Sequence, residues 1–304
     1  MFKKLWDKWG INPLDKQLQM ARLKGAKTFL IPWNRGLGDI PLGLFALVYR
    51  IRQYIPEAQV TFVTREDLKD GFALLKDVDV LVAHLWKRGV PFDLESTLKQ
   101  LGSSISSFDW IIEKPDPTRW LQWQLGRLIP QLEWKGEWDT LHEPFELKPG
   151  ALYVGVHVQT ETHYAYEKNW PLAKWEELFD RLIQEKGAEI LLFGFSQTPP
   201  FKKKGVLDLR GKTNLFQMLS IIKNRCSYLV VPDSGVLSIT YYINASFPIK
   251  IASLWADPKQ GVLRQKVSSP NPKLVHVPLI APKEIISSIP VEKVMHALFA
   301  GSET

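Results

Sequence analysis

A glycine-containing turn carries the first residues that could do chemistry. The apolar segment 28–31 predicts a strand, and Gly36 and Gly38 follow it. Asp39 comes directly before a helical pattern over 41–54. Glycine lets the backbone approach a ligand closely, and a helix start presents free N–H groups to an anion. Asp39 therefore has two interpretations: a helix cap, or a catalytic base at the carboxyl end of a strand, where open α/β sheets bind ligands.

A polar loop supplies the second set of candidates. Thr160, Thr162 and Lys168 lie in the loop 159–169, directly after the predicted strand 153–157. From the residues alone, Lys168 is best interpreted as a solvated surface lysine, and a functional role for this loop comes from the family resemblance described below.

The third set is the turn Pro232-Asp233-Ser234-Gly235, between a predicted strand at 228–231 and a helix at 238–243. The N–H groups of Ser234 and Gly235 could meet a phosphate at the helix start. Asp233 could equally be a helix cap, since Asp is a preferred residue at that position.

Strand and helix patterns alternate along the chain, which predicts βαβ units and parallel sheets. Strands are expected at 28–31, 59–63, 78–82, 110–112, 153–157, 189–193, 207–209, 228–231 and 249–254. Helices are expected at 41–54, 66–75, 91–101, 118–129, 171–185, 214–223, 238–243 and 291–299. The Trp- and Pro-rich segment 115–149 interrupts the alternation. We therefore predict two α/β domains, residues 1–145 and 146–304.

Composition limits the partners and the compartment. The 304 residues have a formal net charge of +7 and a pI of about 9.3, which favours anionic partners. The single cysteine, Cys226, rules out an intrachain disulfide and fits a reducing compartment. Since neither a membrane-spanning stretch nor a signal-peptide pattern is present, we expect a cytoplasmic protein.

The first residues favour a membrane surface. Within 1–12, Phe2, Leu5, Trp6 and Trp9 fall on one helical face and alternate with lysines. A basic helix with an aromatic face can lie on an anionic membrane, here the inner face of the plasma membrane. The alternative is a leader helix packed on the first domain.

Four segments, in this order along the chain, resemble motifs of glycosyltransferase family 9, the lipopolysaccharide heptosyltransferases and their relatives. They are Arg35-Gly-Leu-Gly-Asp39, Lys168-Asn-Trp-Pro171, Leu209-Arg-Gly-Lys-Thr213 and Val231-Pro-Asp-Ser-Gly235. The resemblance implies a GT-B fold: two Rossmann-like domains facing each other across a cleft, the N-terminal one for the acceptor and the C-terminal one for the donor. It also implies inverting, metal-independent transfer from a nucleotide-sugar to a glycan or glycolipid.

The resemblance assigns roles to the candidate residues. Asp39 would be the catalytic base, with Arg35, Gly36 and Gly38 as the acceptor loop. The donor phosphates would be bound by Lys168, Thr160, Thr162, Asp233, Ser234 and Gly235. No metal and no cofactor beyond the nucleotide-sugar substrate are expected. Asp77 and Asp79 have the Asp-x-Asp spacing of metal-dependent enzymes but precede an apolar strand.

Two departures from the family pattern leave the donor open. Ser238 replaces a common histidine, and the segment from Phe195 lacks the acidic residue that usually meets the donor ribose. The alternatives are a non-catalytic nucleotide or glycan binder on the same fold, or another GT-B enzyme such as a nucleotide-sugar epimerase. No nucleic-acid-binding module is recognisable, so nucleic acid is not an expected partner.

Overall fold

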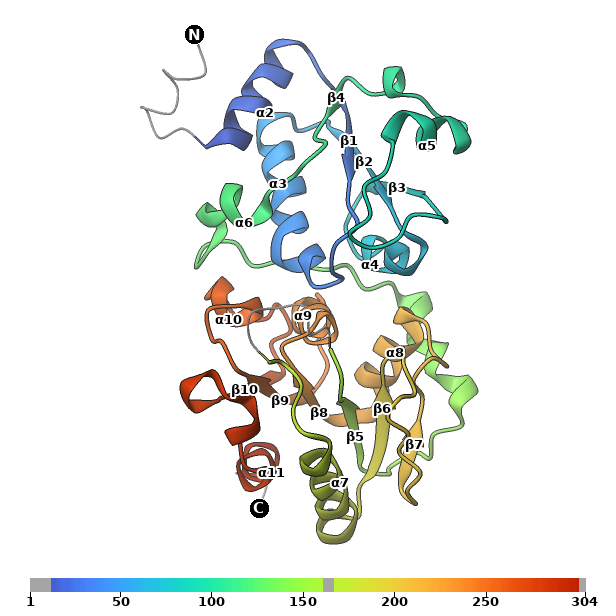
Figure 1. Ribbon diagram of the computed structural model, residues 1–304, viewed down its shortest axis with the longest axis vertical. Helices are drawn as coiled ribbons and strands as arrows, with labels where there is room; N and C mark the ends of the chain where they lie inside the picture. Colours follow the sequence, from blue (N-terminus) through green and yellow to red (C-terminus); the bar gives the residue numbers. More distant parts are fainter. Residues whose placement is uncertain (1–11, 161–166, 301–304) are drawn as a thin grey trace. The chain divides into compact units, whose positions relative to one another are not determined.

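The computed structural model describes residues 12–160 and 167–300, which form two compact units (Figure 1). The units are Met1–Leu132 and Glu133–Thr304. The aromatic leader helix predicted over 1–12 lies outside the described residues, except for Asn12. Each unit contains a parallel sheet of its own, which confirms the predicted α/β class.

The first unit is built on a four-stranded parallel sheet in the order β3-β2-β1-β4. The strands are β1 (Thr28–Pro32), β2 (Gln59–Thr64), β3 (Val78–Val82) and β4 (Trp110–Ile111). The chain moves from β1 to one side through β2 and β3, and then returns to the other side of β1 as β4. The order reverses next to β1, and the carboxyl end of a strand at such a reversal is where open sheets bind ligands.

Helices of the first unit are α2 (Pro13–Leu23), α3 (Phe45–Tyr54), α4 (Lys69–Phe72), α5 (Leu94–Gln100) and α6 (Pro117–Trp120). Helix α2 is fastened to α3 by two bonds from Arg50 to Asp15, of 2.7 and 2.8 Å. Leu14 and Leu18 of α2 are completely buried. Residues from Pro13 onward therefore belong to the core of this unit.

The helix expected at 41–54 is present but begins with a π-helical turn, Ile40–Leu44. A Cβ atom on Gly43 would lie 2.6 Å from the Cβ of Pro117, so glycine allows the segment after residue 116 to pack on this turn. Gln124 donates a hydrogen bond of 2.9 Å to the Leu42 carbonyl from the same segment. The helix that leads away from the glycine turn is thus held from its side.

One predicted helix is wrong. The pattern at 118–129 gives only α6 and a 3-10 turn, Gln122–Gln124. Leu125 is extended and Gly126 has a φ of +70°, so the helical path ends there. The apolar spacing that suggested a helix comes from Leu121, which is buried, and Leu128 in an irregular segment.

The second unit has a six-stranded parallel sheet in the order β10-β9-β8-β5-β6-β7. The strands are β5 (Tyr153–His157), β6 (Glu189–Phe193), β7 (Val206–Asp208), β8 (Cys226–Pro232), β9 (Ile249–Trp255) and β10 (Leu274–Ile280). Its helices are α7 (Leu172–Lys186), α8 (Leu215–Arg225), α9 (Gly235–Tyr242), α10 (Gly261–Gln265) and α11 (Val291–Phe299). The order reverses between β5 and β8, so the binding edge predicted by topology lies where these two strands end.

The main core of this unit packs α7 and α11 against the sheet. Trp175, Phe179 and Leu182 of α7 and Leu298 of α11 are at most 1% exposed and share one cluster with strand residues. Burying an aliphatic or aromatic side chain of this size stabilises the fold by roughly 1.5–3 kcal/mol. The core fixes the strands whose carboxyl ends carry the candidate donor residues.

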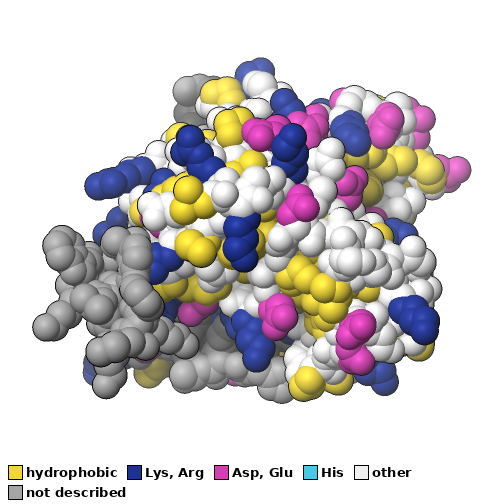
Figure 2. All heavy atoms as spheres, turned by 90° about the horizontal axis from the view of Figure 1, so that it is seen from above, with side chains coloured by type: hydrophobic (Ala, Val, Ile, Leu, Met, Phe, Trp, Pro, Cys, Tyr) yellow, Lys and Arg dark blue, Asp and Glu magenta, His cyan; other side chains and the backbone are white. Residues whose placement is uncertain are grey.

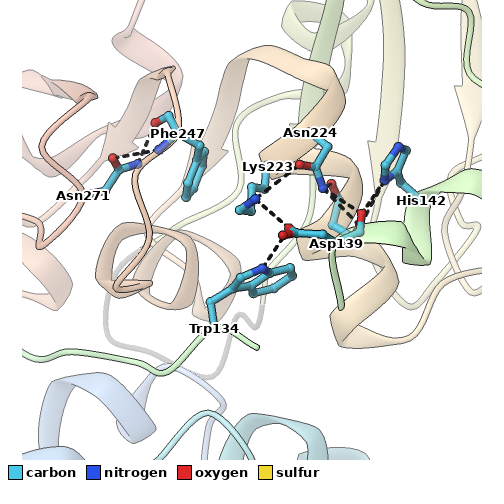
Figure 3. A network of polar contacts seen from close by, with 8 residues as sticks. Trp134, Asp139, His142, Lys223, Asn224, Phe247 and Asn271 are labelled. Atoms are coloured by element: carbon cyan, nitrogen blue, oxygen red, sulfur yellow. Dashed lines mark hydrogen bonds and ion pairs between the residues drawn. The ribbon is translucent and has the colours of Figure 1, made fainter. Parts of the chain in front are cut away.

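The segment that joins the two sheets is anchored to the second unit (Figure 3). The Trp138 ring stacks on Phe216 of α8 with centroids 4.2 Å apart. Asp139 accepts hydrogen bonds from Lys223 at 2.6 Å and from the Trp134 indole at 2.9 Å. Because these contacts tie 134–139 to α8, the expected boundary between 145 and 146 falls inside the second unit.

Candidate functional site

Asp39 closes the glycine turn after β1. Its Oδ2 atom accepts a hydrogen bond of 2.9 Å from the backbone N–H of Gly36. Asp39 occupies the position before the π-helical turn, but its side chain makes no helix-cap bond. The cap interpretation therefore does not describe this residue. The carboxylate is held by the turn at the carboxyl edge of the sheet.

Three arginines surround this turn, and each follows a different strand. Arg35 follows β1, and its backbone carbonyl accepts a hydrogen bond of 3.3 Å from the guanidinium of Arg65, after β2. Arg88 follows β3, and its guanidinium lies near the same turn. A Cβ atom built on Gly36 would lie 3.9 Å from Nη2 of Arg88 and 3.4 Å from Oδ2 of Asp39. Arg65 is also ion-paired with Asp67 at 3.1 Å, so the edge that carries the candidate base holds charges of both signs.

Lys168 and Asp233 form a buried ion pair in the second unit. Lys168 Nζ lies 2.6 Å from Asp233 Oδ2, and each side chain is only 9% exposed. Lys168 is therefore not a solvated loop lysine. It belongs to the loop after β5 and Asp233 to the end of β8, so the pair spans the place where the strand order reverses.

The other residues of the Lys168-Asn-Trp-Pro segment fix the loop. Asn169 accepts a hydrogen bond from the Thr160 backbone N–H at 2.8 Å and donates one to its carbonyl at 3.1 Å. The Trp170 indole is buried and donates to the Ile289 carbonyl at 3.1 Å. Pro171 stands at the start of α7. Asn169 is a positioning residue that our functional assignment did not include.

Ser234, not Asp233, caps helix α9. The Ser234 hydroxyl accepts a hydrogen bond of 3.3 Å from the Leu237 N–H, whereas the Asp233 carboxylate turns toward Lys168. Gly235 opens the helix and is the partly exposed residue of this turn. Ser238 is buried and its hydroxyl donates to the Ser234 carbonyl. First-turn N–H groups of a helix lack intrahelical acceptors, so they can serve an anion near Gly235.

Gly261 is a further site residue that the motifs did not indicate. Its φ is +49°, and a Cβ there would lie 2.5 Å from Asp233 Oδ1 and 2.8 Å from the Trp255 ring. One carboxylate oxygen of Asp233 thus faces Lys168 and the other faces the backbone of Gly261. The Asp233 carboxylate thus holds the Lys168 ammonium group, and the expected role of Asp233 at the donor phosphates stays a prediction.

His157 ends β5 beside the ion pair's loop. The side chain is buried, and burial lowers the pKa of His157 to about 4, so the ring is neutral near pH 7. Its Nδ1 atom has no hydrogen-bond partner among the described residues. At neutral pH the His157 ring therefore adds no positive charge beside this loop.

The candidate residues form two groups, one in each unit. Arg35, Gly36, Gly38 and Asp39 lie on one turn of the first unit. Lys168, Asp233, Ser234 and Gly235 converge in the second, with Thr160 at the base of the same loop. Thr162 lies outside the described residues. The structure leaves the catalytic and binding roles of all these residues as predictions.

Among the described residues, no three His, Cys, Asp or Glu side chains come together as a possible metal site. Asp79 lies in β3 and Asp77 precedes it with a φ of +52°. No described helix has the length and apolar character needed to cross a bilayer. Burial raises the pKa of the Cys226 thiol, in agreement with an inert core cysteine.

Two parallel α/β units are the parts of a GT-B fold, and similarity to solved structures confirms the predicted fold class. A glycosyltransferase family 9 protein from Veillonella parvula DSM 2008 superposes with a TM-score of 0.61 at 16% identity, covering 89% of this chain and 96% of that one. E. coli ADP-heptose lipopolysaccharide heptosyltransferase II gives 0.57 at 16% identity, covering 90% and 98%. E. coli heptosyltransferase WaaC with ADP gives 0.51 at 16% identity, covering 91% and 98%.

A sequence match supports the predicted family independently. Residues 137–242 match glycosyltransferase family 9 (heptosyltransferase). This range includes Lys168, Asp233, Ser234 and Gly235. No curated protein matches the chain. The predicted resemblance to this family is thereby confirmed, and a glycosyltransferase is the class of enzyme that the comparisons support.

Proposed function

We propose that this protein is a metal-independent, inverting glycosyltransferase that moves a sugar from a nucleotide-sugar to a glycan or glycolipid acceptor, in the manner of a lipopolysaccharide heptosyltransferase. The observation that carries the proposal is the buried Lys168–Asp233 pair beside the start of α9. This arrangement joins a fixed ammonium group and helix N–H groups at the edge where topology predicts a ligand.

The second unit would bind the donor. Lys168 and the N–H groups near Gly235 would bind the diphosphate and stabilise the negative charge that grows on it as the glycosidic bond breaks. Asp233 would keep the ammonium group in place. The similar E. coli protein WaaC was solved with ADP, which supports a nucleoside diphosphate as the leaving group.

The first unit would bind the acceptor. Asp39 would take the proton of the attacking hydroxyl as that oxygen bonds to the anomeric carbon and the bond to the diphosphate breaks. A single displacement of this kind inverts the anomeric centre. Arg35 and Arg88 near the turn favour an acceptor that carries negative charge near its hydroxyl, whereas Arg65 is ion-paired with Asp67.

Peripheral attachment to the inner face of the plasma membrane would bring the enzyme to a lipid-linked acceptor. Residues 1–12 would lie on the anionic surface. Helix α2, which follows directly, exposes Met20 and Leu23 at 50% and 83% and carries Arg22. Figure 2 shows lysine, arginine and hydrophobic side chains on the face seen from above, with acidic side chains among them. Each basic residue near such a surface contributes roughly 1 kcal/mol.

A panel of nucleoside diphosphates and nucleotide-sugars in thermal-shift assays tests the proposal, because a ligand that binds only the folded state raises the melting temperature. We expect stabilisation by at least one nucleoside diphosphate, and transfer from the matching nucleotide-sugar that persists in a chelator. Binding without turnover on any acceptor would favour the non-catalytic binder. Conversion of the free nucleotide-sugar into its epimer would favour the epimerase.

A further inference from the structure

Phe195 is a large aromatic side chain held in solvent at the carboxyl edge of the second sheet. It is 84% exposed, and it follows β6 by two residues. A Cβ on its neighbour Gly194 would lie 3.8 Å from Cδ2 of His157, at the end of β5. Phe195 therefore stands next to the strand that carries the Lys168 loop. The proposed phosphate site at the end of β8 is two strand spacings from β6, roughly 10 Å.

A buried ion pair holds the loop that presents this ring. Arg210 is 1% exposed and is bound to Asp208 through Nε at 2.9 Å and Nη2 at 2.7 Å. The Arg210 guanidinium keeps the pKa of the Asp208 carboxyl below its usual value. Arg210 Nη2 also donates to the carbonyls of Gln197 at 3.2 Å and Pro199 at 2.9 Å. Arg210 thus fixes the backbone that follows Phe195.

The backbone on the other side of the ring is fixed as well. Gly211 donates a hydrogen bond of 2.8 Å to the Gly194 carbonyl, and a Cβ on Gly211 would lie 3.2 Å from the Phe195 carbonyl oxygen. Gln197 uses its side-chain amide to donate to the Arg210 carbonyl at 3.0 Å. The loop is therefore ordered by its own contacts, and it buries Phe201 but leaves the Phe195 ring in water.

We propose that Phe195 is the platform on which the nucleobase of the donor stacks, and that it makes the site prefer purines. The inference rests on the proposed function, which places the diphosphate at Lys168. A ribose would span the strand between the two positions. A stacked aromatic ring contacts the face of a base and not the hydrogen-bonding groups at its edge. Since a purine has a larger face than a pyrimidine, stacking favours purines. The Gln197 amide, which could read a base edge, is engaged with Arg210.

The test separates the base from the phosphates. Calorimetry measures the affinities of ADP, UDP and inorganic pyrophosphate for the wild type and for Phe195→Ala, Phe195→Trp and Leu207→Ala. Leu207 lies on neighbouring β7, is 41% exposed and serves as the matched control. Phe195→Ala should weaken ADP binding about tenfold or more, leave pyrophosphate unchanged and reduce the preference for ADP over UDP. Phe195→Trp should preserve ADP affinity, and Leu207→Ala should change nothing.

Three outcomes would overturn the inference. If the wild type binds ADP and Phe195→Ala binds it equally well, the platform assignment fails while the proposed donor site stands. Equal loss of ADP and pyrophosphate affinity in Phe195→Ala would mean that the ring supports the loop and not the base. If the wild type binds neither ligand, the proposed function fails, and this inference fails with it. Because Phe195 is exposed, its replacement should leave the melting temperature unchanged.

Discussion

The buried ion pair between Lys168 and Asp233 is a structural contact, and we propose that its ammonium group also binds the donor phosphates. Breaking a buried pair by removing one partner typically costs 3–5 kcal/mol, because the other charge stays buried and uncompensated. Replacing both charges with neutral groups of similar size is often tolerated. Stability and phosphate binding should therefore separate when the single and double variants are compared.

We predict that Lys168→Met lowers the free energy of unfolding by roughly 3–5 kcal/mol, since it removes the ammonium group that lies 2.6 Å from the buried Asp233 carboxylate. The double variant with Asp233→Asn should recover most of that loss. Neither variant should bind a nucleoside diphosphate, because both lack the ammonium group. Chemical denaturation and calorimetry measure the two properties. A double variant that binds the diphosphate as tightly as the wild type would remove Lys168 from the donor site.

Substitution of Asp39 should change the rate of transfer without changing the stability of the fold. Asn at this position keeps an oxygen that can accept the Gly36 N–H bond, so Asp39→Asn should leave the turn and the melting temperature intact. It cannot take a proton, and loss of a general base costs on the order of 10²–10⁴ in rate. We therefore expect donor affinity to persist while turnover falls by that factor. Turnover within twofold of the wild type would contradict the assignment.

At this scale the sequence identified most of the residues that the structure groups together, but not the bonds that they make. Spacing placed Asp39, Lys168 and Asp233 at strand ends. It could not show that Asp39 closes its own turn, or that Asp233 faces a lysine 65 residues earlier in the chain. These contacts depend on the order of the strands, which local patterns do not encode. Gly261 was missed for the same reason.

At the scale of elements, predictions were most reliable where apolar runs were bounded by turns. Strands such as β1, β5 and β8 lie within a few residues of their expected positions. Strand β10 was not predicted, because Pro278 interrupts its apolar pattern. The structure explains this exception: β10 is an edge strand, where proline is tolerated since one side of the strand has no neighbour to bond.

The short helix α10 matters because its first residue supports Asp233. We predict that Gly261→Ala weakens nucleoside diphosphate binding, since a methyl group 2.5 Å from Asp233 Oδ1 must displace the carboxylate that holds Lys168. Gly187→Ala is the matched control. Gly187 also has a positive φ, of +62°, but nothing lies within 4 Å of its Cβ position. Both variants should lose roughly 1–2 kcal/mol of stability from backbone strain.

Only Gly261→Ala should lose affinity for the diphosphate, in addition to any further loss of stability from the clash. Calorimetry on both variants at one temperature measures the difference. Equal affinity in the two variants would show that α10 does not position the ion pair.

At the scale of the whole molecule, composition predicted a domain boundary between 145 and 146, whereas packing places it between Leu132 and Glu133. The Trp- and Pro-rich segment 115–149 correctly indicated that the repeat of strands and helices stops there. Composition could not show which side each part of that segment packs on. Trp138 belongs to the second unit because its ring lies on Phe216, a contact made by residues 78 positions apart.

The boundary between Leu132 and Glu133 can be tested by comparing the thermal stability of two fragments of the chain. Residues 133–304 should fold alone and unfold in one cooperative thermal transition, since they contain a complete sheet and its core. Residues 146–304 lack Trp138 and Asp139, so the Phe216 ring and the Lys223 ammonium lose their partners. Deleting a buried tryptophan contact typically costs about 3–5 kcal/mol. The shorter fragment should therefore lose a free energy of unfolding of that order and melt at a lower temperature, or aggregate.

Two point variants serve as controls for this comparison. Trp138→Ala in the longer fragment should reproduce most of the loss, whereas Glu137→Ala, at an exposed position, should not. Equal melting temperatures for the two fragments would return the boundary to residue 145.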